Sequence, residues 1–160
     1  MNKKYIPLFS YAPLIVFLDQ LVKIYVDRQM QLYQSIEVVE NFFHITYIRN
    51  RGAAFGMLSG ADESVRVPFF LGISLIAIAV IFYTIYTYHE ESRLFPLSMA
   101  MILGGAIGNM IDRVRFGEVI DFLDVHWYEH HWPAFNVADS AICIGVGLLI
   151  INMFFEKEKS

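Results

Sequence analysis

The segment from Val67 to Tyr88 reads VPFFLGISLIAIAVIFYTIYTY and contains no charged side chain. A helix needs about 20 consecutive apolar residues to cross the hydrocarbon core of a membrane. In lipid, the backbone amides must be hydrogen-bonded within the segment itself, which favours a helix over other local structures. We therefore predict a transmembrane helix over residues 67–88.

Three further apolar segments are long enough to span a membrane, at about 6–26, 95–111 and 137–155. The composition agrees, because 56% of the 160 residues are hydrophobic and 18% are charged, against roughly 45–50% and 25% in soluble domains. The start of the chain is similar to a signal peptide, but no small-residue cleavage site follows it. We predict a single, mainly α, integral-membrane domain over 1–160 with four transmembrane helices.

Two long connections, about 27–66 and 112–136, lie on the same side of this predicted bundle. Within the first, 35–39 and 42–48 are rich in β-forming residues, which predicts a small antiparallel hairpin. A simple count of Lys and Arg does not decide the orientation. The basic start, Lys3-Lys4, favours cytoplasmic termini, so we expect both long connections to be extracytoplasmic.

The polar residues at membrane depth gather at one level of the predicted bundle. Asp19 lies late in the first helix, Asn109 and Asp112 lie at the end of the third, and Asp139 lies at the start of the fourth. Ionisable residues inside membranes are candidates for a functional site. We expect this site near the outer surface of the membrane.

Asp121 and Asp139 both have apolar neighbours and precede or open the fourth helix. Two carboxylates close together in a low-dielectric site share one proton. Such a pair can activate a water molecule and protonate a leaving amine, which is amide hydrolysis by acid–base catalysis. Taken singly, Asp139 could instead be a first-turn acid facing the helix dipole, and Asp121 a surface turn acid.

Other features of the spans have structural interpretations. Asp19 and Lys23 have the favourable i, i+4 order of a helical ion pair, which predicts that they tie the first helix to the site. Gly104, Gly105 and Gly108 predict close helix packing, with a groove for a substrate helix as the alternative.

One metal-binding pattern occurs, because residues 126–130 match HxxEH. That pattern needs a helix, and the nearby Pro133 and tryptophans indicate a membrane-interface segment instead. We expect no metal and no cofactor, and the role of 126–132 stays open. The lone Cys143 excludes an internal disulfide, and we expect it to pack as a small hydrophobe. The net charge of −4 gives no indication of nucleic-acid binding.

Five short motifs occur in order along the chain: Asp19-Gln20-Leu21-Val22-Lys23, Asn50-Arg51-Gly52-Ala53-Ala54-Phe55, Gly108-Asn109-Met110-Ile111-Asp112-Arg113, Val119-Ile120-Asp121-Phe122 and Phe135-Asn136-Val137-Ala138-Asp139-Ser140. Together with four spans in the right places, they resemble the bacterial lipoprotein signal peptidase family, signal peptidase II. The resemblance covers nearly the whole chain.

The resemblance implies an aspartic endopeptidase of the bacterial cytoplasmic membrane. Its substrates would be diacylglyceryl-modified prolipoproteins, cut just before the lipidated cysteine, and globomycin would inhibit it. The catalytic pair would be Asp121 and Asp139. Supporting or substrate-binding residues would be Asp19, Lys23, Asn50, Gly52, Asn109, Asp112, Arg113 and Asn136. Membrane lipid would be a partner, and we expect a monomer.

Two other classes of protein compete with this interpretation. A proton-coupled transporter would use Asp19, Asp112 or Asp139 as a relay, but its acids would lie near the membrane midplane with access from both sides. A four-helix scaffold or assembly factor would not need paired buried acids. The sequence leaves open which aspartate carries the shared proton and which lipoproteins are cut.

Overall fold

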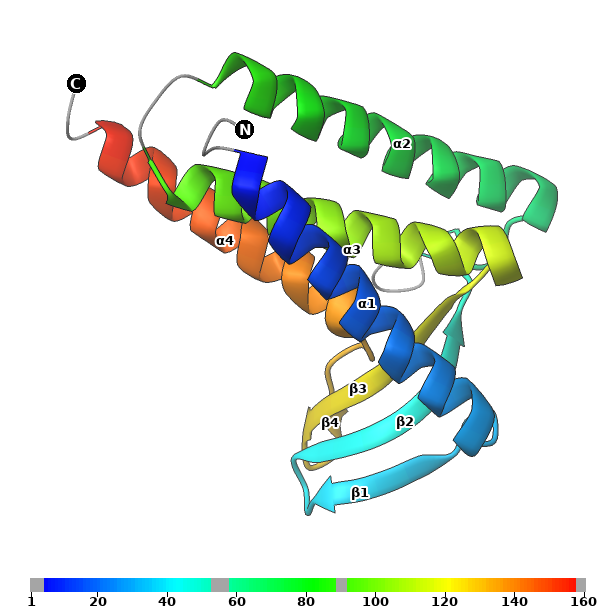
Figure 1. Ribbon diagram of the computed structural model, residues 1–160. Helices are drawn as coiled ribbons and strands as arrows, with labels where there is room; N and C mark the ends of the chain where they lie inside the picture. Colours follow the sequence, from blue (N-terminus) through cyan, green and yellow to red (C-terminus); the bar gives the residue numbers. More distant parts are fainter. Residues whose placement is uncertain (1–4, 53–57, 89–91, 158–160) are drawn as a thin grey trace.

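A computed structural model describes residues 5–52, 58–88 and 92–157. In chain order the elements are α1 (Ile6–Gln29), β1 (Ser35–Val39), β2 (Phe43–Asn50), α2 (Glu63–Thr87), α3 (Leu94–Phe116), β3 (Val119–Trp127), β4 (His130–His131) and α4 (Val137–Lys157) (Figure 1). Each of the four helices is long and apolar enough to cross a membrane. The four predicted spans are therefore confirmed.

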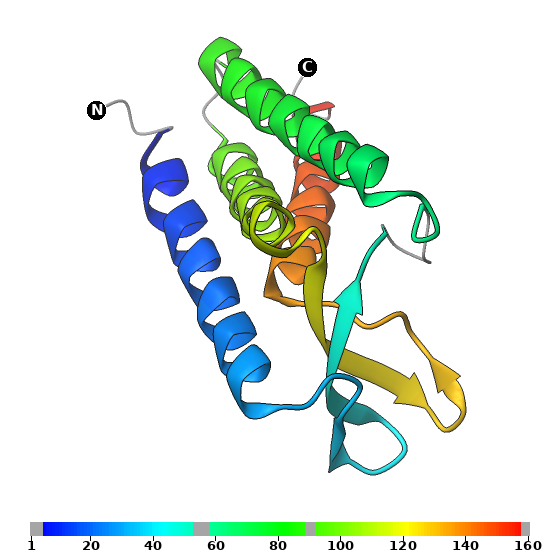
Figure 2. The same cartoon turned by 90° about the vertical axis from the view of Figure 1, so that its right-hand side faces the viewer.

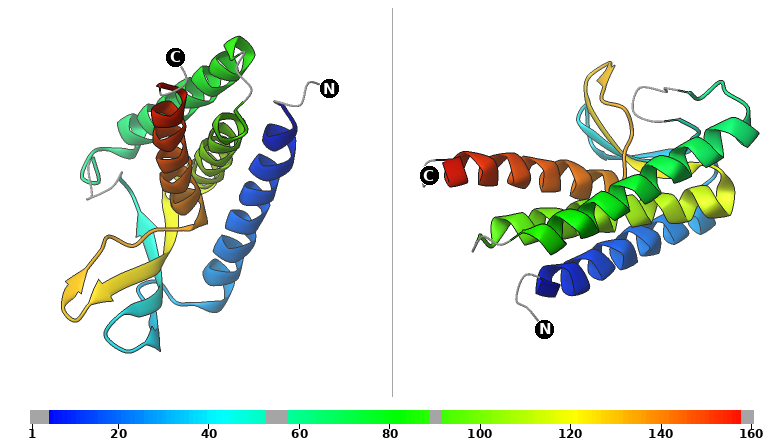
Figure 3. Two further views of the ribbon diagram at one scale, coloured as in Figure 1. Left: turned by 90° about the vertical axis from the view of Figure 1, so that its left-hand side faces the viewer. Right: turned by 90° about the horizontal axis from the view of Figure 1, so that it is seen from above.

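The third helix, α3, is the centre of the bundle. In its most apolar window 61% of the residues are buried, against 17–22% in the other three helices. It lies between α1 and α4, and α2 packs chiefly against it (Figure 3). A cluster at one end of the bundle, including Leu8, Ile81, Ile85 and Leu103, joins α1, α2 and α3.

Glycines let two neighbouring helices approach α3. A Cβ on Gly104 would lie 2.9 Å from the Cβ of Ile15 on α1, and one on Gly105 would lie 2.3 Å from the carbonyl oxygen of Ala138 on α4. The close-packing interpretation of these glycines is correct, and the alternative of a smooth groove for a substrate is wrong, because α1 and α4 occupy that surface.

The end of α3 differs from the prediction. We expected the helix to stop at 111, before Asp112, but it continues to Phe116. Asp112 is fully buried and paired with a lysine, so its charge does not end the helix. The helix ends at Gly117, which takes the left-handed conformation (φ 70°) and donates its N–H to the Arg113 carbonyl.

A four-stranded antiparallel sheet of order β1-β2-β3-β4 lies at the end of the bundle where α1 and α3 finish and α4 begins (Figures 1 and 2). The β1–β2 hairpin confirms the prediction for 35–39 and 42–48. The strand β3 was not predicted, because we expected 112–136 to be a connection. Its pairing with β2 places Asp121 opposite Ile48.

The glycine packing makes a prediction about stability. Gly105→Ala should destabilise the protein by about 1–3 kcal/mol, because the new methyl group clashes with the α4 backbone. Gly147→Ala is the matched control, because a Cβ there meets no atom within 4 Å and alanine favours a helix. Thermal unfolding in detergent micelles checks both, and equal unfolding temperatures would contradict the packing argument.

Candidate active site

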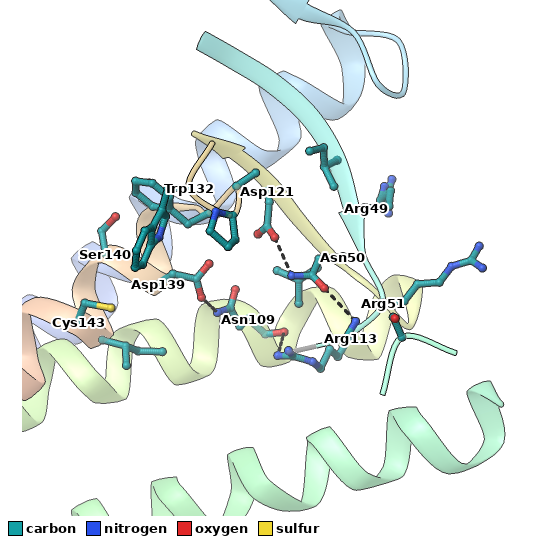
Figure 4. A pocket seen from close by; sticks show the side chains of 18 of the residues that line it. Arg49, Asn50, Arg51, Asn109, Arg113, Asp121, Trp132, Asp139, Ser140 and Cys143 are labelled. Atoms are coloured by element: carbon teal, nitrogen blue, oxygen red, sulfur yellow. Dashed lines mark hydrogen bonds between the residues drawn. The ribbon is translucent and has the colours of Figure 1, made fainter. Parts of the chain in front are cut away.

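A cavity of about 930 Å³ opens where the sheet meets α3 and α4. Asp121 from β3 and Asp139 from the first turn of α4 both line it, and Figure 4 shows the two carboxylates facing the same part of the cavity. The walls also contain Asn50, Asn109 and Arg113. The structure thus brings together the two acids that the sequence paired.

Asp121 is buried, with 2% of its surface exposed. Its carboxylate accepts hydrogen bonds from the side-chain amides of Asn50 (2.9 Å) and Asn136 (2.7 Å). Burial raises the pKa of Asp121 to about 7; the nearby Asp139 adds to the rise, and the two asparagine hydrogen bonds oppose it. The alternative that Asp121 is a surface turn acid is wrong, since the residue lies inside a paired strand.

Asp139 has two structural partners. Its carboxylate accepts a hydrogen bond from Asn109 Nδ2 (2.7 Å) and one from the backbone N–H of Asn136 (3.2 Å). In return, the Asp139 N–H donates to Asn136 Oδ1 (2.9 Å). This reciprocal pair is a capping box at the start of α4. Asp139 is therefore a first-turn acid, as the alternative stated, and it also faces the cavity.

Asn136 connects the two acids. It is fully buried, and its Nδ2 lies within hydrogen-bond distance of Asp121 Oδ1, the Ile120 carbonyl (3.2 Å) and Asn109 Oδ1 (3.2 Å). The same side chain caps α4 through Oδ1. A single amide thus fixes the strand that carries one acid to the helix that carries the other.

Behind this pair lies a buried ionic cluster. Lys23 Nζ contacts Asp19 Oδ2 at 2.8 Å, Asp112 Oδ2 at 3.0 Å and Asn109 Oδ1 at 3.0 Å. Lys23, Asp19 and Asp112 are each at most 1% exposed. Gln20 Nε2 also donates to Asp112 Oδ1 at 2.9 Å. The prediction that Asp19 and Lys23 pair is confirmed, and the pair reaches the site through Asn109.

The segment Asn50–Gly52 ends β2 beside the cavity. Gly52 donates its N–H to Asn50 Oδ1 (2.9 Å), which orients the amide toward Asp121. The expected glycine loop continues through 53–56, which lie outside the described residues. Arg113 lines the cavity, and its guanidinium carbon Cζ lies 4.8 Å from the centroid of the Phe70 ring.

Arg66 is a supporting residue that the sequence reasoning missed. It is 4% exposed and donates to the carbonyls of Arg51 (2.5 Å) and Gly117 (2.7 Å). It thereby joins α2 to the end of β2 and to the turn after α3. The sequence feature that could have indicated this role is the position of Arg66 just before the charge-free segment 67–88.

The HxxEH residues lie in the β3–β4 hairpin rather than on a helix. His126 pairs with His131 across the hairpin and His130 pairs with Trp127, so His126 and His130 do not share the face that the zinc pattern needs. Among the described residues, no group of three His, Cys, Asp or Glu is placed to hold a metal ion. Cys143 is exposed at the cavity rim, so the expectation that it packs inside is wrong.

The fold and site define a class: a multi-pass membrane protein with two carboxylates in one cavity. Residues 11–155 match the family model described as signal peptidase (SPase) II. The chain is 55% identical over 142 residues to the lipoprotein signal peptidase of Geobacter sulfurreducens, covering 89% of this chain and 88% of that one. It is 47% identical to that of Syntrophus aciditrophicus, over 100% of both chains.

The solved structures agree with this match. A bacterial membrane enzyme determined by the in meso method at 2.3 Å resolution superposes with a TM-score of 0.85, at 34% identity, over 95% of this chain and 90% of that one. The chain belongs to the signal peptidase II family and is therefore a peptidase.

The contact between Asn50 and Asp121 yields a prediction. Asn50→Ala removes a hydrogen bond that lowers the pKa of Asp121, so the pKa should rise further and the carboxyl should lose an orienting partner. We expect peptidase turnover to fall by up to about 100-fold and the free energy of unfolding by only about 1 kcal/mol. Glu37→Ala, on the exposed strand β1, is the control. Unchanged turnover in Asn50→Ala would contradict the role.

Proposed function

We propose that the protein is an aspartic endopeptidase that removes the signal peptide from diacylglyceryl-modified prolipoproteins, cutting before the lipidated cysteine. The observation that carries this proposal is the convergence of Asp121 and Asp139 on one cavity, where Asn136 donates to Asp121 through its side-chain amide and to Asp139 through its backbone N–H. Family membership supports the substrate class, because the relatives are named lipoprotein signal peptidases.

In this mechanism the two acids have different roles. Asp121 keeps the shared proton below pH 7, since burial and the neighbouring carboxylate raise its pKa. Asp139 then acts as the base that takes a proton from water, while protonated Asp121 polarises the scissile carbonyl. The water oxygen bonds to the carbonyl carbon, and the proton taken by Asp139 is passed to the departing cysteine nitrogen as the C–N bond breaks.

The other residues position this chemistry. Asn109 and Asn136 hold Asp139 and Asp121 through their amides. Arg113 and the Asn50–Gly52 segment line the cavity, where they can hold polar groups of an extended peptide. In this mechanism the side chains alone carry the proton transfers, and no step uses a metal or a cofactor.

The proposed setting is the bacterial inner membrane, with cytoplasmic termini and the site near the outer leaflet surface. Asp112 lies in the last two turns of α3, Asp139 in the first turn of α4 and Asp121 on β3, where these elements meet at the end of the bundle beside the sheet (Figure 1). A lipidated cysteine at the end of an apolar signal helix would reach that depth while its acyl chains and the helix remain in the membrane. A transporter relay is less favoured, because its acids would lie near the midplane. We also propose that the enzyme acts as a monomer and that globomycin-type inhibitors occupy this cavity.

The catalytic assignment is tested by two isosteric variants. Asp121→Asn and Asp139→Asn should each lower cleavage of a purified diacylglyceryl prolipoprotein by at least about 100-fold, because one acid and one base are both required. Their unfolding temperatures should stay near the parent value. Asp124→Asn, which changes an acid on the same strand outside the cavity lining, should cleave normally. Near-normal turnover in either site variant would refute the pair.

The raised pKa of Asp121 predicts a pH dependence. Above pH 7 the carboxyl loses the proton that the mechanism needs, so kcat/KM should fall as pH rises through about 7. The measurement is a pH–rate profile in detergent with the same substrate. If kcat/KM instead rose through that range, Asp121 would be the base and the assigned roles would be reversed.

The orientation is tested with sealed vesicles. Protease added to inverted inner-membrane vesicles should spare the segment 27–66 and cut near the termini, since we place the sheet on the far side. Cleavage within β1 or β2 in intact inverted vesicles would overturn the topology. Right-side-out vesicles are the control and should give the reverse pattern.

A further inference from the structure

The buried ionic cluster touches the backbone at two places next to the acids. Asp112 Oδ2 accepts a hydrogen bond from the N–H of Ile120 (3.0 Å), the residue before Asp121. Asp19 Oδ1 accepts one from the N–H of Ala138 (2.9 Å), the residue before Asp139. Each acid of the pair is thus preceded by a residue whose N–H is held by a buried carboxylate.

The two holding carboxylates are themselves linked. Lys23 Nζ lies 2.8 Å from Asp19 Oδ2 and 3.0 Å from Asp112 Oδ2. Gln20 Nε2 bridges the same two side chains, at 3.3 Å from Asp19 Oδ2 and 2.9 Å from Asp112 Oδ1. Because all the charged members are buried, solvent screens these contacts little. The cluster therefore connects β3 to α4 through side chains of α1 and α3.

We propose that Asp19, Lys23 and Asp112 are positioning residues that set the separation of the Asp121 and Asp139 carboxylates by holding the residue before each. This inference rests on the proposed function. Consecutive Cα atoms are 3.8 Å apart, so a shift at Ile120 or Ala138 moves the adjacent acid by a similar amount. A displacement of 1 Å in a catalytic group can cost about 100-fold in rate.

An ionic cluster that only stabilised the bundle would behave differently. It would affect folding. Two neutral substitutions would then change activity equally, whether or not the new side chain accepts the backbone hydrogen bond. Asparagine and leucine have the same branched arrangement of side-chain heavy atoms as aspartate, and both lack its charge. Only asparagine offers an oxygen to the N–H of the held residue. Comparing the two variants therefore separates the effect of the lost hydrogen bond from the effect of the lost charge.

The test compares Asp112→Asn with Asp112→Leu in the detergent-solubilised full chain, using a diacylglyceryl prolipoprotein as substrate. We expect kcat per folded molecule to fall less than about tenfold in Asp112→Asn and about 100-fold or more in Asp112→Leu, with KM unchanged in both. The alkaline limb of the rate profile should lie at lower pH in the leucine variant, because a more distant Asp139 raises the pKa of Asp121 less.

Asp19→Asn and Asp19→Leu repeat the comparison at Ala138, so the proposal stays testable if one leucine variant fails to fold. Ile85→Ala, in the cluster at the other end of the bundle, is the control for lost stability and should keep the parent kcat. Equal kcat and equal pH limbs in the asparagine and leucine variants at both positions would overturn the proposal.

A readout without substrate separates this proposal from the proposed function. Hydrogen exchange at the Ile120 and Ala138 amides should be slow in the parent and in the asparagine variants, and fast at the affected amide in each leucine variant. Unprotected amides in the parent would overturn the positioning role. A parent chain that shows protected amides but cleaves no prolipoprotein would overturn the proposed function alone.

Discussion

The arrangement of this protein depends on one buried cation. Lys23 is 1% exposed inside a helix that crosses the membrane, and an unpaired ammonium there would cost several kcal/mol. It is compensated by Asp19 from its own helix and by Asp112 from α3. Those carboxylates in turn accept hydrogen bonds from the first turn of α4 and from β3. Satisfying one charge thus requires that three helices and a strand meet at a single point.

The sequence predicted the local features well, because their causes are local. A charge-free run of apolar residues forms a spanning helix whatever surrounds it, and alternating β-formers next to a short turn form the β1–β2 hairpin. The two acids of the site could be paired because both stand in apolar surroundings next to the start of α4. These inferences needed no knowledge of which segments come together in space.

What could not be predicted depends on contacts between distant segments. β3 forms because β2, about 70 positions earlier in the chain, offers it a partner; the contact between Asn50 and Asp121 joins the two strands. We expected the charge of Asp112 to end a helix, but that carboxylate pairs with Lys23 from α1, and α3 continues to Phe116. Cys143 looked like a core residue from its apolar neighbours, but it faces the open rim of the cavity.

The second helix has a different relation to the site from its neighbours. It packs chiefly against α3, and its most apolar window is only 17% buried. Its charge-free part begins at Val67, and residues 67–87 are about 31 Å long at 1.5 Å per residue, which matches a hydrocarbon core of about 30 Å. The helices α1, α3 and α4 carry Asp19, Asp112 and Asp139, and β3 carries Asp121, whereas α2 reaches this region through Arg66. Arg66 is therefore the contact through which a change in the tilt of α2 would reach the end of β2 and the turn after α3.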